Sequence, residues 1–189
     1  MSESNAVESR LAHDANDPLL ARVEQTYTYS FPENERRDFT LVRRLLAEER
    51  RFELYVLLRD GAYVGFITAW RFEGFVYVEH FAIEAAVRNG GIGARAFSRF
   101  LKRHADPVVL EVEMPVEEMS KRRVGFYERL EFKLDHHVYF QPPYRPGDDW
   151  LEMRLMTYGA LDLDADHAFD RVKSTIHRSV YGVNTMSGQ

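Results

Sequence analysis

The segment that says most about the fold reads Phe81-Ala82-Ile83-Glu84-Ala85-Ala86-Val87-Arg88-Asn89-Gly90-Gly91-Ile92-Gly93-Ala94. An apolar run typical of a strand leads into a cluster of glycines, and an amphipathic helical pattern follows it. Glycines at such a junction let backbone N–H groups approach a bound anion closely. The helix that begins there adds the unpaired N–H groups of its first turn. Residues 88–94, the glycine loop, are therefore predicted to bind the pyrophosphate of a phosphorylated cofactor.

Composition and charge limit the class of protein. The chain has 189 residues, of which 45% are hydrophobic and 29% charged, values typical of one soluble globular domain. A formal net charge of -5 gives no sign of nucleic-acid binding. The absence of cysteine excludes thiol catalysis, cysteine zinc sites and disulfides. The sequence shows neither a signal peptide nor the roughly 20 apolar residues of a membrane span, so we expect a cytoplasmic protein that binds no membrane.

The chain before the glycine loop is predicted to hold two helices and an antiparallel meander. Residues 1–17 are polar and lack periodicity, which predicts a mobile leader. Helical patterns begin at Pro18 and near Pro32. Strands joined by short turns follow, and short turns make neighbouring strands antiparallel. These strands are expected at residues 52–58, 62–72 and 75–83.

After the glycine loop the pattern alternates between helix and strand. Helices are expected from residue 92 to 104, from Pro115 to about residue 130, and over about residues 164–181. Strands are expected at residues 108–113, 132–140 and 150–156. The mixture predicts an α/β (α+β) fold with a single domain over residues 18–189.

The glycines admit two interpretations, of which the first is a dinucleotide site. Gly91-Ile92-Gly93-Ala94-Arg95-Ala96 satisfies the pattern G-x-G-x-x-A, and Glu111 lies 20 positions after Gly91, where a ribose-binding carboxylate is expected. That pattern needs its strand to end almost at the first glycine, whereas residues 84–90 intervene here. It also opens a series of βαβ units, whereas two hairpins precede this loop. A dinucleotide-binding oxidoreductase is therefore the weaker alternative.

The second interpretation accounts for more of the chain. Arg88 to Ala94 fits the pattern (Gln/Arg)-x-x-Gly-x-(Gly/Ala) and follows an antiparallel meander. Val124-Gly125-Phe126-Tyr127-Glu128-Arg129-Leu130-Glu131-Phe132 then gives a helix bearing a tyrosine, a turn and an aromatic strand start. In this order and spacing, the two segments resemble the GNAT superfamily of acetyl-CoA-dependent N-acetyltransferases. The resemblance covers roughly residues 20–158.

The resemblance implies a fold and a cosubstrate. The fold is GNAT-like: a mixed, mostly antiparallel central sheet flanked by helices, with splayed parallel strands at 75–83 and 108–113 and an extra C-terminal helix. The implied cosubstrate is acetyl-CoA, whose pantetheine arm pairs with the strand before the loop and whose pyrophosphate binds the loop, chiefly through backbone N–H groups. The residues matched to these two segments are Phe81, Ala82 and Ile83, then Arg88, Asn89, Gly90, Gly91, Ile92, Gly93 and Ala94.

The second motif matches the family less closely. Tyr127 corresponds to the tyrosine that lies near the coenzyme sulfur and often acts as general acid. Ser120 and Arg123 stand where family members often carry Asn and Ala, and Glu131 stands where they carry Gly. Ser120 is expected to bind the coenzyme or to cap its helix. Glu131 is expected to strain a turn that glycine would make in the left-handed conformation.

Acetyl transfer to an amine needs a base, a polarised thioester carbonyl and a proton for the leaving thiolate. Glu79, just ahead of the coenzyme segment, is the first candidate for the base. His80 is expected on the opposite face of a regular strand, and Glu111 and Glu113 are alternatives that act through water. Direct attack through a ternary complex is expected, because the chain has no cysteine and no nucleophile-elbow serine.

No metal site is predicted. His136 and His137 face opposite sides of the expected strand and lack the spacing of metal ligands. The acceptor is expected to be a primary amine on a small molecule or a peptide.

Contacts with this acceptor are expected from two connections. Phe31 and Glu35 lie in the connection between the first two helices, and Tyr144 lies in a Pro-rich loop. The apolar face of the terminal helix offers a surface for a homodimer. A non-catalytic acyl-CoA-binding sensor stays an alternative, because the second motif departs from the family pattern.

Overall fold

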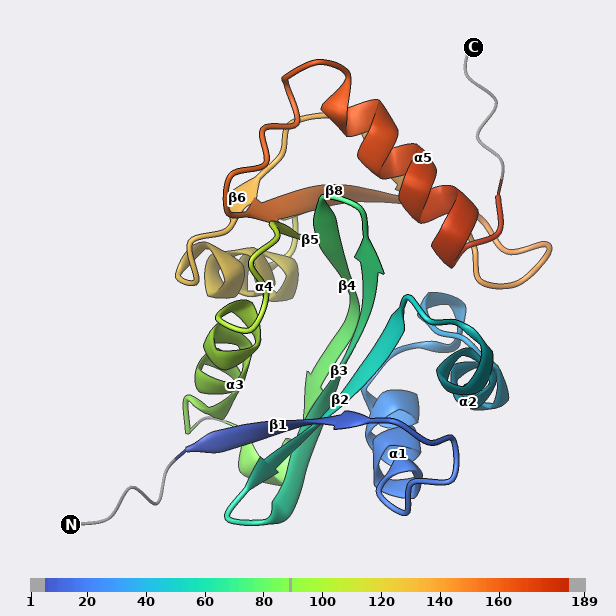
Figure 1. The fold of residues 1–189 in the computed structure, drawn as a ribbon. Coiled ribbons are helices and arrows are strands. Elements are labelled where there is room, and N and C mark those ends of the chain that lie inside the picture. Colours follow the sequence, from blue (N-terminus) through green and yellow to red (C-terminus); the bar gives the residue numbers. More distant parts are fainter. Residues whose placement is uncertain (1–5, 89, 184–189) are drawn as a thin grey trace. The chain divides into compact units, whose positions relative to one another are not determined.

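The computed structural model describes residues 6–88 and 90–183. Asn89, one of the residues expected to bind the coenzyme, lies outside the described residues. The chain divides into two compact units, one ending at Val108 and the other beginning at Val109. Each unit contains strands and helices of its own (Figure 1).

In the first unit an antiparallel meander forms the sheet, in the order β1-β2-β3-β4. Positive φ angles at Asp60 and Gly61 (52° and 76°) and at Gly74 (83°) allow the tight turns that join β2 to β3 and β3 to β4. The strands are β1 (Val7–Ala12), β2 (Phe52–Arg59), β3 (Ala62–Phe72) and β4 (Phe75–Ile83). The boundaries expected for β3 and β4 are confirmed.

Helices cover both faces of this sheet (Figure 1). On one face lie α1 (Leu20–Ser30) and α2 (Phe39–Glu48), with a short 3₁₀ turn (Glu33–Glu35) between them. The ring of Tyr27 in α1 lies 5.8 Å from Phe66 of β3 and 5.6 Å from Phe39 of α2. On the other face lies α3 (Ile92–Leu101), whose Phe97 ring is 4.9 Å from Phe81 of β4. A further 3₁₀ turn (Ala85–Val87) joins β4 to the glycine loop.

The amino-terminal part of this unit differs from the expectation of a mobile leader. Residues 7–12 form β1, which pairs antiparallel with β2 from Val7↔Arg59 to Ala12↔Leu54. Val7 and Ala12 are buried, and an ion pair of 2.6 Å joins Arg10 to Asp17. The second helix also begins later than expected, since α2 starts after Asp38, whose carboxylate accepts a hydrogen bond from the backbone N–H of Thr40.

The second unit holds β5 (Val108–Glu113), whose first residue closes the first unit, and α4 (Glu118–Glu128). The strands β6 (Lys133–Leu134), β7 (Tyr139–Gln141) and β8 (Leu151–Tyr158) follow, and then α5 (Ala168–Val180). β8 lies between β5 and β6 and also pairs with β7; its pairings with β6 and β7 are antiparallel. The strand expected at 132–140 is therefore interrupted, because it ends at Leu134 and the next strand begins at Tyr139.

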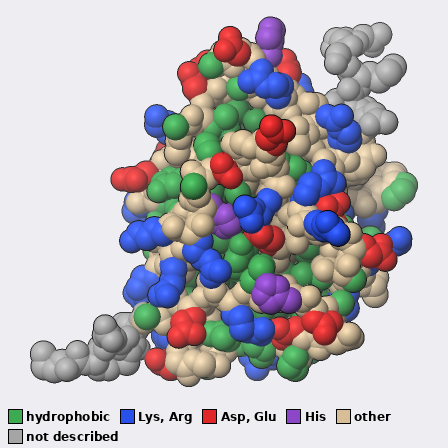
Figure 2. Space-filling view, in the orientation of Figure 1, with side chains coloured by type: hydrophobic (Ala, Val, Ile, Leu, Met, Phe, Trp, Pro, Cys, Tyr) green, Lys and Arg blue, Asp and Glu red, His purple; other side chains and the backbone are tan. Residues whose placement is uncertain are grey.

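The predicted class, a mixed α/β fold with mostly antiparallel strands and a C-terminal helix, is confirmed. The expected splay of parallel strands concerns β4 and β5, which belong to different units, and it stays a prediction. None of the described helices is long and apolar enough to cross a membrane. On the face drawn in Figure 2, basic and acidic side chains are interspersed.

Candidate active site

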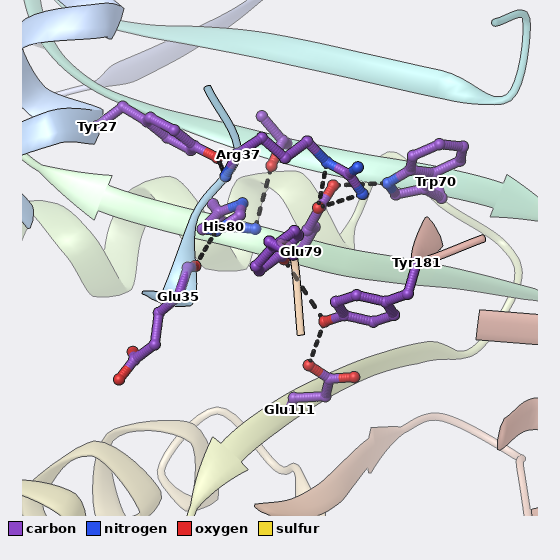
Figure 3. Close-up of polar contacts among 10 residues, drawn as sticks. Tyr27, Glu35, Arg37, Trp70, Glu79, His80, Glu111 and Tyr181 are labelled. Carbon is purple, nitrogen blue, oxygen red and sulfur yellow. Dashed lines mark hydrogen bonds and ion pairs between the residues drawn. The ribbon is translucent and has the colours of Figure 1, made fainter. Parts of the chain in front are cut away.

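A β-bulge in β4 shapes the site in the first unit. Thr68 of β3 pairs with His80, and the next residue, Ala69, pairs with Val78, so Glu79 is the extra residue of the ladder. A bulge breaks the two-residue alternation of side chains and re-aims the residues around it. The expectation that Glu79 and His80 lie on opposite faces is therefore wrong. Both side chains contact α1 or the connection that follows it (Figure 3).

The carboxylate of Glu79 is buried and ion-paired. Its Oε1 accepts a hydrogen bond of 2.9 Å from Arg37 Nε, and the second guanidinium contact to this oxygen is also 2.9 Å. Its Oε2 accepts a hydrogen bond of 2.7 Å from the indole N–H of Trp70. The side chain is 1% exposed. A carboxylate so deeply buried is stable as an anion when a cation and hydrogen-bond donors compensate its lost hydration.

His80 lies beside this pair as a buried imidazole. Burial lowers its pKa, so the ring is neutral at pH 7. Its Nε2 lies 3.0 Å from the carbonyl oxygen of Glu35, and its ring is 4.6 Å from Phe31 and 4.8 Å from Tyr27. Phe31 and Glu35, two of the residues expected to contact the acceptor, are thus adjacent to His80. Figure 3 shows the contact with Glu35.

Tyr27 completes the cluster. Its hydroxyl oxygen accepts a hydrogen bond of 2.9 Å from the backbone N–H of Arg37, which fixes the end of the connection just before the N-cap of α2. Burial, with the charge of Glu79 adding to it, raises the pKa of Tyr27, so the phenol stays protonated. The sequence analysis did not single out Tyr27, Arg37 or Trp70. The hairpin turn at Glu73-Gly74 could have identified Trp70, because it sets the register that pairs Trp70 with Tyr77, two residues before Glu79.

The glycine loop leads into the amino terminus of α3. Gly91 is the N-cap residue of α3 and has a φ of 66°, a left-handed conformation that favours glycine. A Cβ atom at Gly91 would lie 3.1 Å from the guanidinium of Arg95, whose NH2 group donates to the carbonyl of Gly90 at 2.8 Å. Ile92, Gly93 and Ala94 form the first turn, where N–H groups have no partner inside the helix.

Arg88 supports the loop rather than extending from it. Its Nε donates a hydrogen bond of 2.9 Å to the carbonyl of Ile83 at the end of β4, and its NH2 group lies 3.3 Å from the hydroxyl of Ser30. The backbone of Phe81, Ala82 and Ile83, the segment expected to pair with pantetheine, pairs along one edge with β3. The predicted pairing of this segment with pantetheine stays a prediction.

In the second unit, Tyr127 is a buried residue of α4. Its ring packs against Phe126 and Phe132 at 5.1 and 5.5 Å, and burial raises its pKa to about 12. Ser120 caps the start of the same helix: its hydroxyl donates to the carbonyl of Glu117 and accepts from the N–H of Glu117. The structure therefore shows the capping role that was one of the two expected for Ser120. Glu131 has a φ of 70°, as its place in the motif predicts.

Glu111 is surrounded by tyrosines within the second unit. One of its oxygens accepts a hydrogen bond from Tyr139, and the other accepts one of 2.8 Å from Tyr181 (Figure 3). The hydroxyl of Tyr144, an expected acceptor contact, lies 3.5 Å from that of Tyr181. Glu113 instead pairs with Arg123 at 2.9 Å. Donors within the second unit thus already contact both carboxylates.

Comparisons with known proteins decide the family. The model of the acetyltransferase (GNAT) family matches residues 18–132. A GNAT-family protein of known structure from Bacteroides thetaiotaomicron is 40% identical, with 93% of this chain and 99% of that chain covered and a TM-score of 0.87. The chain belongs to the GNAT acetyltransferase family. The dinucleotide-binding interpretation of the same glycines is therefore wrong.

More distant structures share the GNAT fold. Arabidopsis thaliana Naa50, in complex with the bisubstrate analogue CoA-Ac-MVNAL, is 16% identical over 82% of this chain and 99% of its own, with a TM-score of 0.58. A GNAT acetyltransferase from Elizabethkingia anophelis with acetyl-CoA bound is 12% identical over 84% of this chain and 100% of its own, with a TM-score of 0.57. The comparison with curated proteins gave no significant match.

Proposed function

We propose that this GNAT-family protein transfers acetyl from acetyl-CoA to a primary amine by direct attack in a ternary complex. The observation that carries the proposal is the glycine loop: a left-handed Gly91 opens α3 after the bulged strand β4 and the 3₁₀ turn Ala85–Val87, in a chain of an acetyltransferase family. The amine nitrogen attacks the thioester carbonyl carbon, the C–S bond breaks, and the products are an amide and the free thiol of coenzyme A.

The coenzyme would be held by its pyrophosphate at the start of α3. The N–H groups of Gly91, Ile92, Gly93 and Ala94 and the positive end of the helix dipole suit a dianionic group. Support comes from the Elizabethkingia anophelis relative of the same fold, which carries acetyl-CoA. The hydrogen bond from Arg88 to the carbonyl of Ile83 would keep the loop in place rather than contact phosphate.

The Glu79–His80 pair is the candidate for amine activation. An alkylamine arrives at neutral pH as an ammonium ion and must lose a proton before it attacks. The anionic Glu79 attracts the cation, and its carboxylate is the proposed base. The neutral His80 beside it is the alternative base, because a neutral imidazole can accept a proton.

Tyr127 is proposed to protonate the leaving thiolate. A phenol whose pKa is raised to about 12 is protonated at neutral pH, so its O–H can hydrogen-bond the sulfur and supply a proton as the C–S bond breaks, with the phenol regaining its proton from water. It cannot serve as a base under these conditions, so the roles of Glu79 and Tyr127 are distinct.

Peptide amino termini are the first acceptors to test. The analogue bound to Naa50, a protein of the same fold, joins coenzyme A to a peptide, and Phe31, Glu35 and Tyr144 are the proposed contacts of the acceptor in this chain. A small-molecule amine is the other class. Homodimerisation through α5 and a cytoplasmic location are parts of the same proposal.

Calorimetric titration with acetyl-CoA, with NADH as the control ligand, tests the proposal first. Saturable binding of acetyl-CoA alone is expected. Thiol release is then measured on a panel of peptides, polyamines and amino sugars. Binding with no thiol release on any amine would support the acyl-CoA sensor instead, and the absence of acetyl-CoA binding would overturn both.

A further inference from the structure

A compact group of histidine and aspartate side chains lies in the second unit, around the connection between β6 and β7. β6 ends at Leu134 and β7 begins at Tyr139, so His136 and His137 are not in a strand. Opposite strand faces, one of the two grounds for predicting no metal here, therefore do not apply; the other ground was the spacing of the two histidines in the sequence. Their rings stack on each other with centroids 4.4 Å apart.

Asp135 fixes the orientation of His137. One carboxylate oxygen accepts the backbone N–H of His137 at 3.0 Å, and the other lies 3.0 Å from its Nδ1. The backbone N–H of Asp135 donates in turn to the carbonyl of Leu155 in β8, at 2.9 Å. The far face of the His137 ring stacks on Phe169 of α5, with centroids 4.3 Å apart and planes 13° apart. A carboxylate on Nδ1 favours the tautomer whose lone pair is on Nε2.

Both Nε2 atoms converge on Asp164. The Nε2 of His136 lies 3.6 Å from Asp164 Oδ1, and the Nε2 of His137 lies 3.7 Å from the same oxygen. Asp164 belongs to the connection between β8 and α5, where the backbone N–H of Asp164 bonds the carboxylate of Asp162 at 3.0 Å. Potential ligand atoms of Asp135, His136 and His137 all lie within 4.8 Å of one another.

We propose that His136, His137 and Asp164 bind a first-row divalent cation such as Zn²⁺. Asp135 is not a ligand in this proposal but orients His137 through a hydrogen bond to its Nδ1. Tetrahedral zinc with bonds of about 2.0–2.1 Å places neighbouring ligand atoms roughly 3.3 Å apart. The nitrogen–oxygen distances of 3.6 and 3.7 Å need shifts of a few tenths of an ångström to reach it. Two imidazoles select Zn²⁺, Ni²⁺ or Cu²⁺ over Mg²⁺ and Ca²⁺, which prefer oxygen ligands.

The charges around the cluster suit a cation. Asp162, Asp166 and Asp170 flank the ligands in sequence. The basic residues Arg171 and Lys173 follow, and Lys173 pairs with Asp170 at 3.0 Å and packs on Phe169. Side chains of His136 and Asp164 are 74% and 64% exposed, which leaves the site open to solution. A bound ion would tie the β6–β7 connection to the segment before α5.

The same contacts would arise if protonated histidines paired with the aspartates, and metal titration separates the two cases. Tag-free protein, stripped with a chelator, is titrated calorimetrically with ZnCl₂ and, as a control, with MgCl₂. One site with a micromolar or lower Kd for Zn²⁺ and no heat from Mg²⁺ is expected. No saturable Zn²⁺ binding would overturn the proposal.

Variants locate the ion. His136→Ala and Asp164→Asn, both at exposed side chains, should weaken Zn²⁺ binding at least tenfold, and Asp135→Asn should weaken it about tenfold through His137. His13→Ala, at an exposed histidine in the first unit, is the matched control and should bind as the wild type does. Equal affinity in His136→Ala and the wild type would place the ion elsewhere and overturn the assignment. Because the readout is metal binding, the outcome is independent of acetyl transfer.

Discussion

One carboxylate oxygen of Glu79 accepts from Arg37 and the other accepts from Trp70, and these contacts have two opposing effects on a general base. Arg37 keeps the group ionised, as a base requires, but every donor on a carboxylate also makes it less basic. The bulge that carries Glu79 inward is the reason that the strand offers both this anion and His80 on one side. The residue scale is therefore where the proposed chemistry is most directly tested.

Replacing Glu79 with Gln should lower kcat by 10²-fold or more, because a general base contributes about 10²–10⁴-fold. It should also destabilise the fold by about 3–5 kcal/mol, since Arg37 is left buried without its counter-ion. The control Glu48→Gln removes an exposed partner of Arg44 and should change stability by less than about 1 kcal/mol, with kcat retained. Steady-state kinetics and urea unfolding measure both effects. An unchanged kcat in Glu79→Gln would transfer the base role to His80.

Replacing Tyr127 with Phe should lower kcat by about 10²-fold and leave the Kd for acetyl-CoA within about twofold. The reason is that the ring keeps its packing against Phe132 while the proton donor is lost. Thiol release gives kcat and calorimetry gives the Kd. Full turnover in the variant would exclude Tyr127 as the acid.

At the scale of elements, turn chemistry explains which boundaries could be predicted. The D-G and E-G dipeptides predict the two hairpin turns, and Gly61 and Gly74 have positive φ angles there. β3 and β4 consequently have the predicted bounds. β1 was missed because it is an edge strand with buried residues at its two ends, Val7 and Ala12, and its partner is over 40 positions away. The strand predicted at 132–140 is longer than the observed β6. The Asp135 carboxylate accepts the hydrogen bond of the His137 backbone N–H, which is therefore not available to a neighbouring strand.

Replacing Gly91 with Ala should weaken acetyl-CoA binding at least tenfold. The left-handed conformation costs a non-glycine residue roughly 1–2 kcal/mol, and the new methyl group would displace Arg95. Gly61→Ala is the matched control, since Gly61 has a similar φ of 76° with no atom within 4 Å of its added Cβ. It should lose a similar amount of stability and keep coenzyme affinity. Equal coenzyme affinities in the two variants would contradict the role of the glycine loop.

Replacing Glu131 with Gly should raise the free energy of unfolding by about 1 kcal/mol. Glu131 holds a φ of 70° in the turn between α4 and β6, a conformation that costs a side-chain-bearing residue roughly 1–2 kcal/mol, offset in part by the flexibility glycine adds to the unfolded chain. Urea unfolding measures the change, and Glu131→Ala, which keeps the strain, is the control. A destabilised glycine variant would show that the side chain of Glu131 contributes more than its backbone costs.

For the molecule as a whole, buried histidines link stability to pH. His177 of α5 lies between the rings of Tyr139 and Trp150, and within the described residues neither of its ring nitrogens makes a hydrogen bond. Burial, with the charge of Lys173 adding to it, lowers its pKa to about 4. Burial lowers the pKa of His80 in the same direction.

Lowering the pH from 7 to 5 should therefore destabilise the protein, by about 2 kcal/mol from His177. The unfolded chain protonates this histidine near pH 6.5 and the folded chain near pH 4, so the unfolded state binds more protons in that window. His177→Leu should lose less stability over the same interval. Urea unfolding at pH 7 and pH 5 gives the free energy of unfolding of both proteins. An equal loss of this free energy in the wild type and in His177→Leu would contradict a neutral buried His177.

The residues of the site were predictable in part, for a physical reason. The glycine loop, Tyr127 and Glu79 are candidates because local patterns single them out, and their roles stay predictions. Tertiary packing and a bulge bring Arg37, Trp70 and Tyr27 to the cluster. No local sequence pattern predicts either feature. The same holds for Asp164, which meets His136 across a separation of 28 positions.

The ordered strand at Val7–Ala12 bears on how the chain can be cut for laboratory use. β1 covers the backbone edge of β2, whose residues Leu54 to Leu57 are all buried. Shortening the chain to residue 18, the start that a polar leader would suggest, would leave that apolar strand with unpaired N–H and C=O groups. An uncovered edge of this kind is a template for pairing between chains. Recombinant versions should therefore begin before Val7.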